Sequence, residues 1–190
     1  MSSLTRMAII NAFAELAAEK TIDKITVKDI TDRCQVSRNT FYYHFKDVYD
    51  VLEKLLDLET TRVHQLIEED MSHVNEEEAC LKGLQYMLNH RDMFYHIYRS
   101  AGKEEVRKYL EKTVTAIFDY QVNLLSRGIP ASEGDKALIS RFYRYAFKGF
   151  LEEWLEGKMD RPMEETIHRM GILFRDNLIE SLKRSTENPE

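Results

Sequence analysis

The stretch ITVKDITDRCQVSRNTFYYHFKD, residues 25–47, carries the clearest structural signals in the first part of the chain. Thr26, followed three residues later by Asp29, forms a capping box, which predicts a short helix over 26–33. After a break of three residues, a second short helix is predicted over 37–45. Two short helices joined in this way have the lengths of a helix-turn-helix, whose second helix enters the major groove of DNA.

The residue types at the contact positions show whether these two helices can pack together. The positions where they must touch are all apolar: Ile30, Cys34, Val36, Phe41 and Phe45. The other faces of the second helix carry Arg38, Asn39, Tyr42, Tyr43 and Lys46. A core helix would not direct cations and an amide outward when its buried face is already filled. The pattern favours a contact surface, although packed tyrosines with wet hydroxyls and a structural His44 stay open as alternatives.

Charge is distributed unevenly along the chain. The formal net charge is −6, yet residues 1–46 hold seven Lys or Arg against five Asp or Glu. Within residues 20–46 the count is six against three. A local excess of cations favours phosphate contact, and an acidic remainder keeps other surfaces away from a duplex. Chance variation among solvated charges would give the same count.

The two cysteines, Cys34 and Cys80, have no paired spacing, so neither a disulfide framework nor a zinc cluster is expected. No charged-then-apolar leader opens the sequence, and no apolar run reaches the length of a membrane span. We therefore expect a cytoplasmic protein with no membrane partner. No cofactor is predicted.

Apolar residues recur at intervals of three and four through most of the chain, and strand signals are nearly absent. One example is the set Ile9, Ala12, Phe13, Leu16 and Ala17. The sequence therefore predicts an all-α protein of about nine helices. Ser37 and Asp47 are the expected caps of the third and fourth helices. The later helices are predicted over 47–70, 76–89, 91–100, 103–127, 134–156 and 162–184.

The chain closely resembles the TetR family of bacterial transcriptional regulators in TRMAIINAFAELAAEK (5–20) and in the opening stretch, and the resemblance extends to about residue 52. It implies a three-helix DNA-binding domain over 1–46. The family's DNA contacts carry over to Lys28, Ser37, Arg38, Asn39, Tyr42, Tyr43 and His44, and its phosphate contacts to Thr26, Thr40 and Lys46. Arg38 has the chemistry to bind guanine O6 and N7, and Asn39 to bind adenine N6 and N7.

Two positions depart from the family's pattern. Gln35 stands where the family usually has the glycine of the turn, and a left-handed non-glycine residue costs ~1 to 2 kcal/mol. The alternative is a turn of different construction. Val48 stands where the family usually has a phosphate-binding lysine, for which Lys46 is the expected substitute. Losing one phosphate contact lowers the slope of the salt dependence by ~0.9.

The segment FYRYAFKGFLEEWLEGKM (142–159) is similar to a C-terminal type common in TetR-like regulators of low-GC Gram-positive bacteria. The resemblance implies that residues 47–185 bind an effector and form a homodimer, with 186–190 as a frayed tail. The expected interface uses helices 134–156 and 162–184 of both subunits. The candidate interface residues are Phe142, Ala146, Gly149, Phe150, Trp154, Ile172, Leu173 and Leu178. The small pair Ala146 and Gly149 would allow close helix approach, or is accidental.

An aromatic and methionine-rich group on the middle helices forms the candidate effector pocket. Its residues are Tyr86, Met87, Met93, Phe94, Tyr98, Phe118 and Tyr120. Such a group is also typical of an ordinary core; as a cavity lining it favours a flat or apolar small molecule. His64, His90 and His96 lack the spacing of metal ligands, so no metal site is predicted.

The leading hypothesis is therefore a dimeric one-component transcriptional regulator, usually a repressor in this family, that binds a palindromic double-stranded operator under effector control. The alternative is a TetR-like coregulator that acts through ligand or protein binding, with weak or no direct DNA binding. An enzyme is not predicted, because no nucleophile, base and orienting residue can be assembled with suitable spacing.

Overall fold

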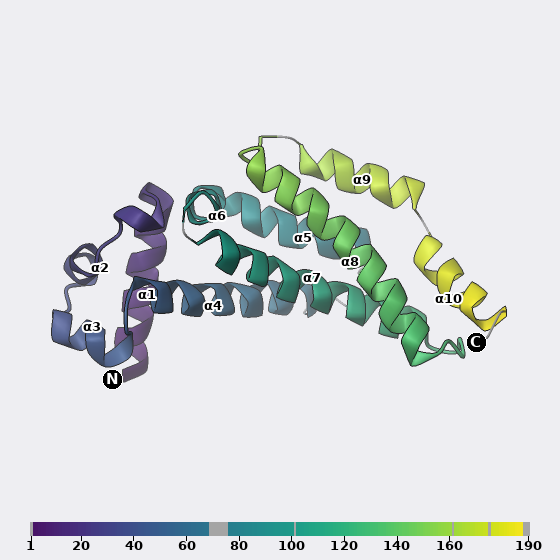
Figure 1. Cartoon of the computed structure of the whole chain (residues 1–190), viewed down its shortest axis with the longest axis horizontal. Helices are drawn as coiled ribbons and strands as arrows, with labels where there is room; N and C mark the ends of the chain where they lie inside the picture. Colours follow the sequence, from purple (N-terminus) through teal and green to yellow (C-terminus); the bar gives the residue numbers. More distant parts are fainter. Residues whose placement is uncertain (1, 69–75, 101, 161, 175, 188–190) are drawn as a thin grey trace. The chain divides into compact units, whose positions relative to one another are not determined.

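The computed structural model describes residues 2–68, 76–100, 102–160, 162–174 and 176–187 (Figure 1). These residues form α-helices and one short 3-10 helix, with no strand among them, so the predicted all-α class is confirmed. The chain divides into two compact units. The head unit comprises Met1–Arg62 and Met87–Tyr109, and the body unit comprises Val63–Tyr86 and Leu110–Glu190.

The head unit is built on α1, which buries the predicted apolar stripe of Ile9, Ala12, Phe13, Leu16 and Ala17. Its elements are α1 (Ser2–Glu19), η1 (Ile22–Lys24), α2 (Val27–Cys34), α3 (Arg38–His44), most of α4 (Val48–Glu68), α6 (Arg91–Tyr98) and the start of α7 (Lys103–Leu125). Both α2 and α6 pack against α1, and α3 packs against α2. Figure 1 shows α2 and α3 on the same side of α1.

Side-chain caps fix where α3 and α4 begin, as predicted. The Ser37 hydroxyl accepts a hydrogen bond from the backbone N–H of Thr40 at 3.0 Å. The Asp47 carboxylate accepts one from the N–H of Asp50 at 2.9 Å. Each cap satisfies a backbone donor that the first turn of a helix would otherwise leave unpaired.

The junction of α6 and α7 is held tightly inside the head unit. His96 Nδ1 lies 2.9 Å from the carbonyl oxygen of Ala17, one of the last carbonyls of α1. A Cβ at Gly102 would lie only 2.8 Å from Cγ2 of Ile97, so this turn admits glycine alone without rearrangement. The contact of His96 attaches α6 to the end of α1.

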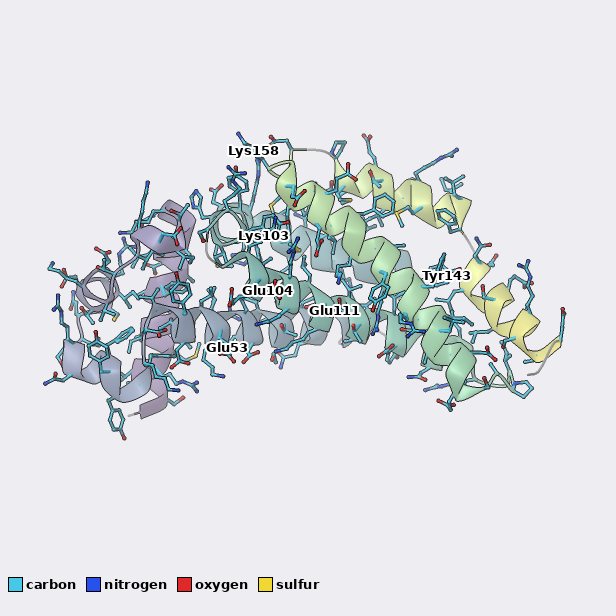
Figure 2. The ribbon with its side chains drawn as sticks, viewed as in Figure 1. Glu53, Lys103, Glu104, Glu111, Tyr143 and Lys158 are labelled. Carbon is cyan, nitrogen blue, oxygen red and sulfur yellow. The ribbon has the colours of Figure 1, made fainter. Side chains whose placement is uncertain are left out.

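The body unit contains most of α5 (Glu76–Asn89), the rest of α7, α8 (Glu133–Glu156), α9 (Met163–Leu173) and α10 (Asn177–Glu187). The ring of Phe118 on α7 stacks on Tyr143 at 6.3 Å and meets the edge of Phe147 at 5.9 Å, both on α8. Figure 2 shows Tyr143 projecting from α8. On the other side, α10 packs against α8 and buries Leu182.

The interval predicted as one helix over 162–184 contains two helices. The first ends at Leu173 with Phe174 as its C-cap, and Asp176 adopts a left-handed conformation with φ of 61° before α10 begins. Asp is among the few non-glycine residues that adopt this conformation at moderate cost. No proline or glycine marks the break, which is why the sequence pattern did not reveal it.

Candidate DNA-binding surface

The turn between α2 and α3 keeps the backbone form that a glycine would adopt. Gln35 has φ of 55° and ψ of 41°, in the left-handed region, and its N–H donates to the carbonyl of Thr31. The N–H of Val36 donates to the same carbonyl at 3.1 Å. The turn therefore has the same left-handed backbone that the family's glycine would adopt, and this conformation costs ~1 to 2 kcal/mol at Gln35.

The apolar residues predicted to join α2 and α3 are largely buried. Ile30, Phe41 and Phe45 are fully buried, while Cys34 and Val36 are half-buried. The Cys34 sulfhydryl lies 3.1 Å from the carbonyl of Ile30, and burial raises the pKa of this thiol. These contacts hold α3 at a fixed angle to α2.

The outer face of α3 is open to solvent. Arg38 and Asn39 are exposed, and the exposed fractions of Tyr42 and Tyr43 are 58% and 79%. The two tyrosines therefore do not pack between helices within this chain. His44 is half-buried, with its ring 5.0 Å from that of Tyr43 in an edge arrangement.

Three of the six Lys and Arg residues within 20–46 form ion pairs inside the head unit. The pairs are Lys20 with Asp29 (3.0 Å), Lys28 with Asp32 (2.5 Å), and Arg33 with Glu15 (3.1 Å) and Glu19 (3.0 Å). Within residues 2–46 of the head unit, the cations without a carboxylate partner are Arg6, Lys24, Arg38 and Lys46. Two of these four lie on α3 or directly after it, so the unpaired positive charge gathers around this helix.

Three predicted phosphate or DNA contacts already have structural tasks. The Thr26 hydroxyl accepts from the N–H of Asp29 at 3.2 Å and lies 2.8 Å from its carboxylate, which in turn accepts from the N–H of Thr26 at 2.9 Å. The hydroxyls of Ser37 and Thr40 share a hydrogen bond of 2.8 Å. Each hydroxyl would have to rotate or share its proton to contact a phosphate.

The capping box also sets the charge state of Asp29. The hydrogen bond from the backbone of Thr26, followed by those from Lys20 and the Thr26 side chain, lowers the pKa of this carboxyl to about 2. The carboxylate is therefore ionised throughout the neutral range and stabilises the N-terminus of α2.

The start of α4 lacks a cation at the expected place. Val48 is its first residue and is half-buried, while Lys46 is exposed two residues earlier and donates its backbone N–H to Asp50 at 3.0 Å. Sequence reasoning missed Arg6, whose guanidinium lies 5.6 Å from the ring centroid of Phe45 at the end of α3. No local spacing relates these two residues, so only the fold brings this cation to the end of α3.

The candidate pocket residues fall into both units. Met87, Met93, Phe94 and Tyr98 belong to the head unit and are buried, and Phe94 lies 5.4 Å from the ring of Tyr109. Tyr86, Phe118 and Tyr120 belong to the body unit. Within the body unit Phe118 is buried, Tyr86 is half-buried and Tyr120 is exposed.

The candidate interface residues separate into an exposed and a buried set. Exposed in the single chain are Phe142, Ala146, Gly149, Phe150, Ile172 and Leu173. Trp154 and Leu178 are instead buried, with exposed fractions of 1% and 2%. These two residues stabilise the interior of the body unit and are not available to a partner subunit.

Neither a metal centre nor a membrane span is found in the described part of the chain. No three His, Cys, Asp or Glu side chains gather there in a way that could hold a metal ion. The side chain of His64 lies outside the described residues, while His90 is exposed. None of the described helices is both long and apolar enough to cross a membrane.

The fold and this surface together define a helix-turn-helix DNA-binding protein. A family model described as bacterial regulatory proteins of the tetR family matches residues 9–55, and one described as a transcriptional regulator C-terminal region matches residues 74–176. The second match covers more than half of the chain. The chain therefore belongs to the TetR family, whose members regulate transcription.

Structural comparison agrees with this fold. The solved structure of the "Dihydroxyacetone kinase operon activator DhaS" matches with a TM-score of 0.72, over 95% of this chain and 97% of that chain, at 17% identity. At this identity the likeness shows the fold alone. Comparison with curated proteins finds no match.

Proposed function

We propose that this chain is a homodimeric one-component regulator that binds a palindromic operator through the outer face of α3. The observation that carries the proposal is the exposure of Arg38, Asn39, Tyr42 and Tyr43 on a helix whose inner face is fully packed. Arg38 reads a base edge in the major groove, and the unpaired Lys46 contacts a phosphate. The half-buried His44 and the capping residues Thr26, Ser37 and Thr40 are secondary candidates.

The homodimer is supported by a second apolar face on α8. Phe147, Leu151 and Trp154 fill the interior of the body unit, while Leu138, Phe142 and Tyr145 are more than half exposed elsewhere around the helix. A large exposed apolar surface is typical of a protein interface. A two-fold dimer built on this face would present two copies of α3 to two half-sites.

Control by a small-molecule effector completes the proposal. The family match supports a ligand-binding role for the C-terminal region. The packed rings of Phe118, Tyr143 and Phe147 are an aromatic cluster whose chemistry suits a flat or apolar effector. An effector that changes the separation of the two reading helices would prevent both half-sites from binding together. Repression is the usual output in the family, whereas the structural neighbour DhaS is named an activator.

A coregulator with weak DNA binding is the second candidate, and Val48 is the observation that favours it. Because the first turn of α4 offers the half-buried Val48 and not a cation, each subunit has one phosphate contact fewer than the family pattern implies. Salt-sensitive binding to a defined operator would exclude this candidate.

The test is binding of the purified protein to DNA from its own upstream region, measured by fluorescence anisotropy at several salt concentrations. Arg38→Ala should weaken operator binding by about 5- to 150-fold per half-site, because a bidentate arginine–guanine contact contributes ~1 to 3 kcal/mol. Lys24→Ala is the matched control, since it removes an exposed, unpaired cation of the same unit from η1. Equal losses in both variants would contradict a reading role for Arg38.

A further inference from the structure

One surface pair on α2 places a negative charge beside the proposed DNA contacts. Lys28 and Asp32 lie one helical turn apart, both exposed, with Nζ and Oδ2 separated by 2.5 Å. The hydrogen bond to Asp32 is the largest cause that raises the pKa of Lys28, while the charge of Arg38 acts in the opposite direction. Lys28 and Asp32 lie on α2, the helix against which α3 packs.

Asp32 has no evident task in folding. The start of α2 is capped by Thr26 and Asp29, so Asp32 is not needed there. Among the described residues Asp32 forms an ion pair with Lys28, and exposed pairs of this kind stabilise a fold only weakly. A carboxylate at this position would be repelled by the phosphates of a bound duplex.

We propose that Asp32 is a positioning residue that holds the ammonium group of Lys28 away from DNA phosphates and so limits the affinity of the protein for the DNA backbone. This inference rests on the proposed function. Phosphate contacts carry no sequence information, so the restraint acts equally on operator and non-operator DNA. Its consequence is a shorter residence on non-operator sequences, which outnumber operators greatly.

The test is a cycle of four full-length proteins: the parent chain, Asp32→Asn, Lys28→Gln and the double variant. Operator and random duplexes of equal length are titrated across a series of salt concentrations. Asp32→Asn should tighten binding to both duplexes by roughly 3- to 30-fold at moderate salt, because one weak ion pair is released in each subunit. The salt slope should steepen by about 1.8, or ~0.9 for each of two newly neutralised phosphates.

The dependence on Lys28 separates this role from a general charge effect. In the Lys28→Gln background, Asp32→Asn should change affinity no more than Asp23→Asn does. Asp23 lies on η1, is exposed and has no ion pair in the described part of the chain, so it gives the same charge change without releasing a lysine.

Two outcomes would overturn the inference. One is an unchanged affinity for Asp32→Asn, and the other is an equal gain with and without Lys28. Failure of the proposed function has a different signature, since the parent chain itself would then show no salt-sensitive binding to any duplex. A gain that requires Lys28 and is equal for operator and random DNA supports the proposal.

Discussion

The head unit and the body unit each expose side chains that a stable core would not require, but the chemistry of those side chains differs. On α3 the exposed residues are a cation, an amide and two phenols, of which Tyr43 is 79% exposed. On α8 they are apolar, with Phe142 at 68%. Cations and phenols suit a polyanion with polar base edges, whereas exposed phenyl rings suit another protein surface.

The comparison also separates two ways of holding an exposed surface in place. In the head unit, Arg33 of α2 binds Glu15 and Glu19 of α1, so carboxylates of one helix fix the position of the next. In the body unit, Glu111 of α7 binds Lys148 of α8 at 2.6 Å, and the rings of Phe118 and Tyr143 stack between the same two helices. Figure 2 shows Glu111 on α7 and Tyr143 on α8. In both units, ion pairs therefore join neighbouring helices beside the packed side chains.

The largest expected effect is the loss of the dimer in Phe142→Glu. A two-fold interface contains this substitution twice, and a buried aromatic anchor contributes ~2 to 4 kcal/mol. We expect the dimer dissociation constant to rise by about 100-fold or more, measured by analytical ultracentrifugation, with operator affinity falling as a consequence. Circular dichroism should show unchanged helix content.

The matched control for Phe142→Glu is Asn123→Glu, which adds the same charge at an exposed position of α7 in the same unit. This variant should remain a dimer. A Phe142→Glu protein that sediments as the parent does would contradict the use of this face of α8 as the interface.

Local signals account for the parts of the fold that sequence alone predicted. The capping box at Thr26 and the caps at Ser37 and Asp47 act over three residues, so the starts of α2, α3 and α4 can be read directly from the letters. The left-handed Asp176 has no such signal, and it divides the last predicted helix. The cap that satisfies a carbonyl of α1 comes from His96, 79 residues away.

The surfaces were harder to predict because α8 is apolar around much of its circumference. Trp154 and Phe142 both fit an apolar pattern of period 3.6, yet the structure buries the first and exposes the second. Periodicity identifies apolar faces but does not say which one faces the chain's own core. In the head, Lys28 and Asp32 have the spacing of an i,i+4 pair, although Lys28 was predicted only as a DNA contact. The bonds from Arg33 to α1 have no such local spacing and depend on the fold.

A smaller effect is expected from Asp29→Asn, which tests how the head unit is held together. The variant loses the carboxylate that accepts from the N–H of Thr26 and pairs with Lys20. We expect the free energy of unfolding at pH 7 to fall by roughly 1 kcal/mol. Urea denaturation followed by circular dichroism measures it, and Asp23→Asn, which removes an exposed carboxylate without a cap, is the control.

The effect of Asp29→Asn on the free energy of unfolding should depend on pH. Because folding lowers the pKa of Asp29 from 3.8 to about 2, the folded state binds this proton less readily than the unfolded state. The stability that the carboxylate contributes is present above pH 3.8 and is lost as the pH falls toward 2. The difference between the parent and Asp29→Asn should therefore shrink over that window. A constant difference down to the lower pH would contradict the cap as its source.

The smallest expected effect is a gain of stability in Gln35→Gly. Glycine removes a left-handed strain of ~1 to 2 kcal/mol but adds ~0.5 to 1 kcal/mol of backbone entropy to the unfolded chain. The net gain in the free energy of unfolding should be about 1 kcal/mol or less. Gln35→Val should act in the opposite direction, because a β-branched residue at φ of 55° is strained further.

These two variants of Gln35 also distinguish a residue that positions α3 from one that contacts DNA. The turn positions α3 through its backbone, and the Gln35 side chain is exposed at the edge of the motif. If the side chain has no contact with DNA, Gln35→Gly should leave operator affinity within about twofold of the parent, since surface positions without contacts contribute little. A larger loss of affinity in a more stable protein would make Gln35 part of the reading surface, and the glycine usual in the family would then be absent for a functional reason.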